Sequence, residues 1–116
     1  IKILGKTNIE RNNLLKLAKE SERLGAKAIL LECITADTAK LITKNISIPT
    51  IGIGASKYCD GQVLVFDDLI NLDPNNKKPK FVKNYLNFNK IASKTVKRYN
   101  REVKLKKFPS LKFTYN

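Results

Sequence analysis

Residues 26–69 read AKAILLECITADTAKLITKNISIPTIGIGASKYCDGQVLVFDDL, and this stretch decides the fold class of the 116-residue chain. Three short apolar runs lie in it, at 28–31, 48–53 and 63–66. Each run is nearly continuous rather than alternating, which is typical of parallel strands buried on both faces. A helical stretch, 36–45, separates the first two runs, and a strand, a helix and a strand within about 25 residues form a βαβ unit. The sequence therefore predicts an α/β fold with a parallel sheet or barrel.

A carboxylate, Glu32, stands at the end of the first apolar run. In parallel α/β folds the chemistry is found at the carboxyl ends of the strands, so Glu32 has the position of a catalytic group. Burial of an unpaired charge there would be costly. From the residues alone two explanations stay open. One is a structural ion pair or helix cap, and the other is a general base whose pKa is set by the site.

Small and polar residues follow the other two runs. The segment GIGAS contains Gly52 and Gly54, but Lys57 stands where the third glycine of a dinucleotide-binding fingerprint would be. These glycines instead indicate close approach of the backbone to a ligand, or close packing. Asp67 and Asp68 follow the third run. We expect them to cap the next helix, and a role as polar groups beside a substrate is the alternative.

Three helices are predicted around the strands. Thr7 and Glu10 form a capping box for a helix over residues 8–24, which Gly25 is expected to end. Thr35 is expected to cap the second helix, and the third is predicted over 89–106. The residues expected to face inward are Leu14, Leu17, Ala18, Ser21 and Leu24 in the first helix, Ala39 and Ile42 in the second, and Ile91, Thr95, Arg98 or Tyr99, and Val103 in the third.

The net charge of +13 is concentrated near the C-terminus. Residues 1–76 contain 10 basic and 9 acidic side chains, whereas residues 77–116 contain 13 basic and 1 acidic. A nucleic-acid patch is one interpretation. We favour a solvated helix face, because Lys outnumbers Arg 19 to 4 and Arg is the usual base-reading residue.

The amino-acid composition also indicates the cellular compartment of the protein. Cys33 and Cys59 form no CxxC pair and the chain has no His, which disfavours a zinc site. A reducing cytoplasm fits this cysteine usage best. No apolar run approaches the ~20 residues of a membrane span. We therefore expect a cytoplasmic protein with no membrane and no nucleic-acid partner.

The segments ILLEC, IPTIGIGAS, CDGQVLVFDDL and PKFVKNY, followed by a late FP, together resemble the ketopantoate hydroxymethyltransferase family. This family is also called 3-methyl-2-oxobutanoate hydroxymethyltransferase. The resemblance implies the C-terminal portion of a (β/α)8 TIM barrel, with about three parallel strands plus covering helices, and residues 77–116 as a basic helical C-terminal extension. A complete barrel needs roughly 200–250 residues. We therefore expect a fragment of a single barrel domain that lacks its N-terminal half and is inactive alone.

The resemblance also implies a reaction. The family transfers a hydroxymethyl group from 5,10-methylenetetrahydrofolate to 3-methyl-2-oxobutanoate, which gives ketopantoate for pantothenate biosynthesis. A base assists enolate formation on the Mg²⁺-chelated 2-oxo acid, and Glu32 matches the catalytic glutamate of the family. The Mg²⁺ ligands are expected in the N-terminal half, so no residue here is assigned to the metal or to the folate. A homo-oligomer is expected for the full-length protein.

This sequence departs from the usual family pattern at three positions, Ser56, Asp67 and Phe113. Ser56 replaces a glycine, Asp67 replaces a histidine that many members have, and Phe113 stands where the tail often has a histidine. A related barrel lyase that acts on small oxo acids through the same enolate chemistry is the alternative enzyme. A basic nucleic-acid-binding module is the alternative outside enzymes.

Overall fold

The computed structural model describes residues 2–75 and 77–115. These residues divide into two compact units. The first unit extends to Val65 and includes Lys78–Val82, and the second consists of Phe66–Lys77 and the residues from Lys83 onward. The elements are α1 (Asn8–Arg23), β1 (Ile29–Glu32), α2 (Ala36–Asn45), β2 (Thr50–Ile53), β3 (Gly61–Gln62), α3 (Phe66–Ile70), α4 (Phe88–Lys104) and a 3₁₀ turn (Leu111–Phe113).

A three-stranded sheet organises the first unit, with the order β1-β2-β3 and parallel pairing throughout. The predicted parallel sheet is thus confirmed. The predicted third strand, 63–66, is wrong in its extent, because β3 covers only Gly61–Gln62. The register explains the difference. Gly52 of β2 pairs with Gln62 and β2 ends at Ile53, so residues beyond Val63 have no partner on β2.

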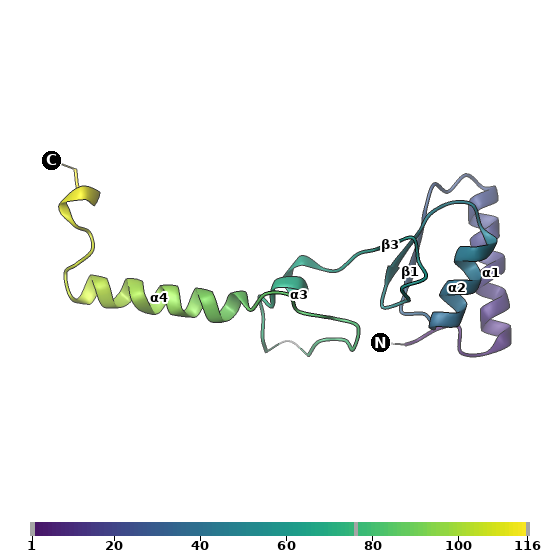
Figure 1. Ribbon diagram of the computed structural model, residues 1–116, viewed down its shortest axis with the longest axis horizontal. Coiled ribbons are helices and arrows are strands. Elements are labelled where there is room, and N and C mark those ends of the chain that lie inside the picture. The colour runs from purple at the N-terminus through teal and green to yellow at the C-terminus, as the bar shows by residue number, and fades with distance from the viewer. Residues whose placement is uncertain (1, 76, 116) are drawn as a thin grey trace. The chain divides into compact units, whose positions relative to one another are not determined.

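Both α1 and α2 lie against one face of this sheet (Figure 1). The Thr7 hydroxyl accepts a hydrogen bond from the Glu10 amide at 3.1 Å, so the predicted cap of α1 is confirmed. The Glu10 carboxylate accepts in return from the Lys6 amide at 3.0 Å. These bonds satisfy amides that a helix start leaves unpaired.

The core of the first unit is small and lies between the helices and the sheet. Ala39 and Ile42 of α2 are fully buried, as predicted. In α1 only Ala18 is buried, whereas Leu17, Ser21 and Leu24 are exposed, so those three predicted inward positions are wrong. The reason is geometric: no element in the described part of the chain covers the side of α1 on which they lie. The core cluster comprises Ala18, Leu31, Ile34, Ala39, Ile42 and Cys59.

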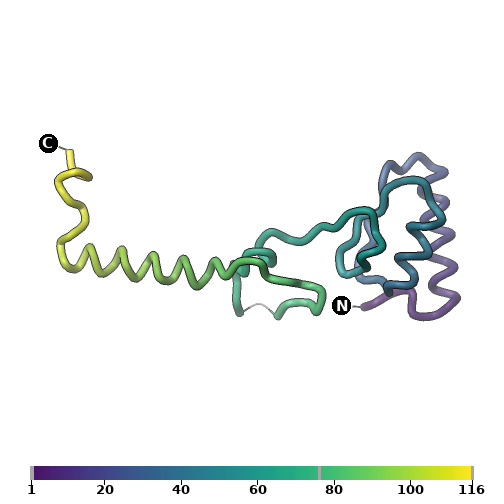
Figure 2. The backbone as a smooth tube through the Cα atoms, in the orientation of Figure 1, coloured from purple at the N-terminus to yellow at the C-terminus, as the bar shows by residue number. Residues whose placement is uncertain are grey.

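The second unit is helical. The helix predicted over 89–106 is confirmed as α4, and Figure 2 shows the chain turning sharply after it. Asn87 caps α4 by accepting from the Lys90 amide at 3.2 Å. The apolar residues of α4 remain exposed, with Val96, Tyr99 and Val103 between 42% and 55% accessible. From the predicted inward stripe, the Tyr99 ring packs against Phe108 at a centroid distance of 5.6 Å, whereas Ile91 and Val103 remain exposed.

Three parallel strands with helices on one face are consistent with part of a (β/α)8 barrel, in which helices cover the outside of the strands. The coarse prediction of an α/β fold is confirmed. Closure into a barrel involves strands beyond these three and stays a prediction.

Candidate active site

Glu32 is the last residue of β1 and lies at the carboxyl end of the sheet. Side chains alternate between the two faces of a strand. Leu31 points into the helix-covered core, so Leu30 and Glu32 point to the opposite face. The register places Ile51 beside Leu30 and Ile53 beside Glu32 on that face. The carboxylate therefore ends an otherwise apolar surface, which we call the open face.

Glu32 is exposed, and the expectation of a buried carboxylate is wrong. The open face has no covering element in the described part of the chain, and Leu30 on it is 58% accessible. No hydrogen bond or ion pair to Glu32 is found among the described residues. Within the described residues, neither an ion pair nor a helix cap formed by this carboxylate is observed.

A groove of about 240 Å³ runs along the outer edge of β1. Glu32 lies at one end of it, and the rest of its lining is apolar apart from Ser21. The lining residues are Leu4, Leu14, Leu17, Ala18, Ser21, Ile29, Leu30, Leu31, Glu32, Ile34 and Ile42. Four of the five residues predicted to form the inward stripe of α1 thus line this groove.

The backbone after Glu32 has an uncommon conformation. Cys33 is buried and has a φ of 51°, in the left-handed region that residues with a side chain rarely adopt. Its amide donates to the Ile53 carbonyl at 2.9 Å, and its carbonyl accepts from the Leu4 amide at 3.0 Å. Cys33 is therefore held on both sides, directly beside the candidate base. Sequence analysis did not identify this role, because no local pattern marks a non-glycine residue for positive φ.

Thr35 is the N-cap residue of α2, as predicted, but its side chain makes no capping hydrogen bond. Its hydroxyl lies 2.8 Å from the Gly5 carbonyl oxygen and 2.8 Å from the Thr38 hydroxyl. Thr38 is fully buried and its hydroxyl donates to the same Gly5 carbonyl at 2.9 Å. The hydroxyls of both threonines thus tie the start of α2 to the N-terminal segment.

The glycines after β2 have steric roles. Gly54 has a φ of 60°, and a Cβ there would lie 2.6 Å from the Phe81 ring. At Gly52 a Cβ would lie 2.9 Å from the Gln62 side chain. These contacts favour close packing over a dinucleotide loop. Ser56 is not among the described residues with positive φ, so its backbone does not require glycine.

The remaining candidate residues, Asp67, Asp68 and Phe113, lie in the second unit. Asp67 and Asp68 lie within the first turn of α3 rather than before it, so the prediction that they cap the helix is wrong. The Phe113 ring packs against Phe108 at a centroid distance of 5.8 Å. No group of three or more potential metal-ligating side chains occurs within residues 2–75 and 77–115.

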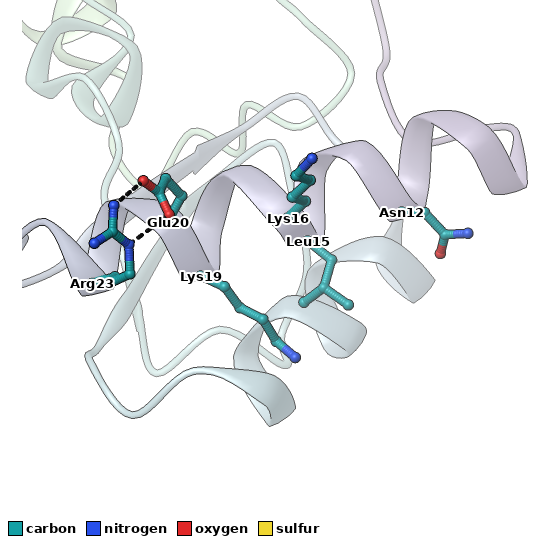
Figure 3. Close-up of a pocket in the computed structure, with 6 residues that line it drawn as sticks. All are labelled: Asn12, Leu15, Lys16, Lys19, Glu20 and Arg23. Atoms are coloured by element: carbon teal, nitrogen blue, oxygen red, sulfur yellow. Dashed lines mark hydrogen bonds and ion pairs between the residues drawn. The ribbon is translucent and has the colours of Figure 1, made fainter.

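A second depression, of about 460 Å³, lies on α1 (Figure 3). Half of its six lining residues are basic, namely Lys16, Lys19 and Arg23. The Arg23 guanidinium donates two hydrogen bonds to Glu20, at 2.6 and 2.9 Å, which lowers the pKa of that carboxyl. This depression shares no lining residue with the groove at Glu32. The one arginine in its lining, Arg23, is already paired with Glu20, so we assign no function to this depression.

The fold and the site together define a parallel α/β chain with a free carboxylate at a strand end. Comparison with known proteins is more specific. The family described as ketopantoate hydroxymethyltransferase matches residues 1–111. Proteins named 3-methyl-2-oxobutanoate hydroxymethyltransferase are 46% identical in Thermosipho melanesiensis, Thermotoga maritima and Clostridium kluyveri, over 98%, 94% and 98% of this chain. The chain belongs to the ketopantoate hydroxymethyltransferase family, as the sequence motifs predict.

The chain spans about two fifths of the length of these curated relatives, with 43%, 40% and 40% of the three proteins covered. Among the described residues, no helix has the length and apolar character needed to cross a membrane.

Proposed function

We propose that a protein containing this chain transfers a hydroxymethyl group from 5,10-methylenetetrahydrofolate to 3-methyl-2-oxobutanoate and so forms ketopantoate. Family membership supports this proposal, together with relatives whose printed name is 3-methyl-2-oxobutanoate hydroxymethyltransferase. The observation that carries the assignment to a residue is the unpaired carboxylate of Glu32 at the carboxyl end of β1.

In this proposal Glu32 is the general base. Its carboxylate accepts the proton from C3 of the oxo acid, and the electron pair of the broken C–H bond remains on the substrate as an enolate. C3 of the enolate is then the nucleophile toward the one-carbon unit. The apolar open face around Leu30 and Ile53 would contact the branched methyl groups of the substrate.

The magnesium ion and the folate complete the proposal. We propose that the metal ligands lie outside this chain, as the family resemblance implies. No residue of the chain is assigned to the folate. The family resemblance supports both groups.

The cellular setting is also a proposal. We expect a cytoplasmic homo-oligomer without a nucleic-acid partner. The exposed apolar residues of α4, such as Tyr99 and Val103, support a subunit contact because isolated helices rarely leave such a stripe uncovered. The basic residues of α4 then remain as its solvated face.

A chimaeric enzyme tests the proposed function. In this chimaera, residues 1–116 replace the matching segment of the Thermosipho melanesiensis relative, to which they are 46% identical. We expect the chimaera to catalyse deuterium exchange at C3 of 3-methyl-2-oxobutanoate without the folate donor, and to form ketopantoate when 5,10-methylenetetrahydrofolate is added. Exchange is followed by NMR. A folded chimaera that does neither would contradict the proposed function.

A further inference from the structure

The residues around Gly5 and Cys33 form a hydrogen-bonded connection next to Glu32. We call Leu4, Gly5, Cys33, Thr35 and Thr38 the strand-end clamp. Its main-chain bonds join Leu4 to Cys33 at 3.0 Å and Thr35 to Leu4 at 3.0 Å. Its side-chain bonds join the hydroxyls of Thr35 and Thr38 to the Gly5 carbonyl at 2.8 and 2.9 Å.

The clamp leaves little freedom to its members. A Cβ at Gly5 would lie 2.5 Å from the Thr38 hydroxyl oxygen, so the two residues are in direct contact. The threonine hydroxyls carry one proton each, and the three short oxygen–oxygen distances show that both protons are used inside the clamp. Thr38 is fully buried, so no water replaces these bonds.

The left-handed backbone of Cys33 requires such support. This conformation is unfavourable for a residue with a Cβ and persists where surrounding contacts determine it. The direction of the Glu32 side chain depends on the path of the backbone through Cys33. The clamp is the set of contacts that determines this path on the side of β1 away from β2.

We propose that Gly5, Thr35 and Thr38 are positioning residues for Glu32, acting through Cys33. This inference rests on the proposed function, since it assumes that Glu32 is the base. A reacting group must be held close to its productive geometry, and a displacement of about 1 Å can cost about 100-fold in rate. The clamp supplies this restraint to a carboxylate for which the described residues provide no hydrogen-bond partner.

Two fully buried threonines provide a matched test in the chimaera. Thr38 belongs to the clamp at the carboxyl end of the sheet, whereas Thr50 starts β2 at the amino end, and both are fully buried. Thr38→Val and Thr50→Val each remove one threonine hydroxyl from a fully buried position. We expect Thr38→Val to lower kcat for C3 exchange about 10-fold with KM changed less than about twofold. Thr50→Val should lower the melting temperature but leave kcat unchanged.

Two further measurements separate positioning from stability. Thr38→Ser keeps the hydroxyl and should restore kcat. Hydrogen exchange should become faster at the Leu4 and Thr35 amides in Thr38→Val and stay unchanged there in Thr50→Val, whatever the catalytic rate.

The outcomes are distinguishable. An active chimaera whose kcat is unaffected by Thr38→Val would overturn the positioning role alone, as would an equal loss of kcat in both valine variants. Unchanged exchange of the Leu4 and Thr35 amides would also overturn it. A folded parent chimaera that is inactive would overturn the proposed function and this inference with it.

Discussion

The Asp60 carboxylate accepts two hydrogen bonds from Thr50 through one oxygen, from the amide at 2.8 Å and from the hydroxyl at 3.0 Å. The Asp60 amide donates to the Thr50 hydroxyl at 3.2 Å. The hydroxyl oxygens of Thr43 and Thr50 lie 2.9 Å apart. This network joins the turn before β3 to the start of β2. It lies at the amino end of the sheet, away from Glu32.

The first prediction concerns the pH dependence of this network. The hydrogen bonds from the amide and hydroxyl of Thr50 lower the pKa of Asp60. Because the folded-state pKa lies below the unfolded one, Asp60 stabilises the fold at pH values above its ordinary pKa of about 3.9, and this stability is lost as the pH falls through the folded pKa. Asp60→Asn in the chimaera should therefore lower the melting temperature at pH 7, and the difference from the parent should shrink below about pH 4. A difference that stays constant down to pH 3 would contradict this.

The second prediction concerns Glu32 in the same chimaera. Glu32→Gln keeps the shape of the side chain but removes its basicity, so C3 exchange should fall about 10²–10⁴-fold. Substrate binding, measured by calorimetry, should largely persist. Glu22→Gln is the matched control, because Glu22 is a structural carboxylate that accepts from the Ser47 amide at 2.8 Å. An exchange rate for Glu32→Gln equal to that of the parent would show that Glu32 is not the base.

The third prediction compares two glycines with positive φ. A Cβ at Gly25 would meet nothing within 4 Å, whereas one at Gly54 would overlap the Phe81 ring. Gly25→Ala should cost about 1–2 kcal/mol of stability from the backbone alone. Gly54→Ala should cost more, because the ring must also move. Equal melting temperatures for the two variants of the chimaera would argue against the packing role of Phe81.

The fourth prediction concerns the 116-residue chain expressed alone. Its core is small, and Leu17 and Leu30 are 62% and 58% accessible. We expect poor folding, aggregation and no exchange activity, because the open face and the β1 edge have no cover within the described residues. Gel filtration and a thermal melt measure this. A soluble monomer with a sharp cooperative melt would contradict it.

The fifth prediction concerns the basic C-terminal region. We expect only weak, strongly salt-dependent DNA binding, in the non-specific range of about 10⁻⁴–10⁻⁶ M at physiological salt. Fluorescence anisotropy of labelled duplexes with unrelated sequences measures it in the chimaera. Tighter, sequence-specific binding would favour the nucleic-acid alternative.

Much of the first unit could be predicted from short segments of sequence. The run before Glu32 predicts β1, and Thr7 with Glu10 predicts the start of α1. These features depend on neighbouring residues along the chain, so local patterns report them. The candidate base was found in the same way, by its position at the end of a strand and by a family motif.

The predictions that differ from the structure have a different origin. The length of β3 depends on its register with β2, which no residue near Val63 encodes. The Thr35 hydroxyl was expected to accept a capping bond from its own helix, but it makes none and instead donates to the Gly5 carbonyl 30 residues earlier. Such contacts join segments that are distant in the sequence.

By itself, the sequence determined the parallel α/β class, the helices, the family and the place of Glu32 at a strand end. Only the tertiary structure decided that Glu32 is exposed with no partner among the described residues, that Cys33 beside it is left-handed, and that Thr38 of α2 binds the Gly5 carbonyl. The physical reason is that apolar periodicity and capping are local properties of the chain. Burial, register and hydrogen-bond partnership depend instead on which segments meet in space.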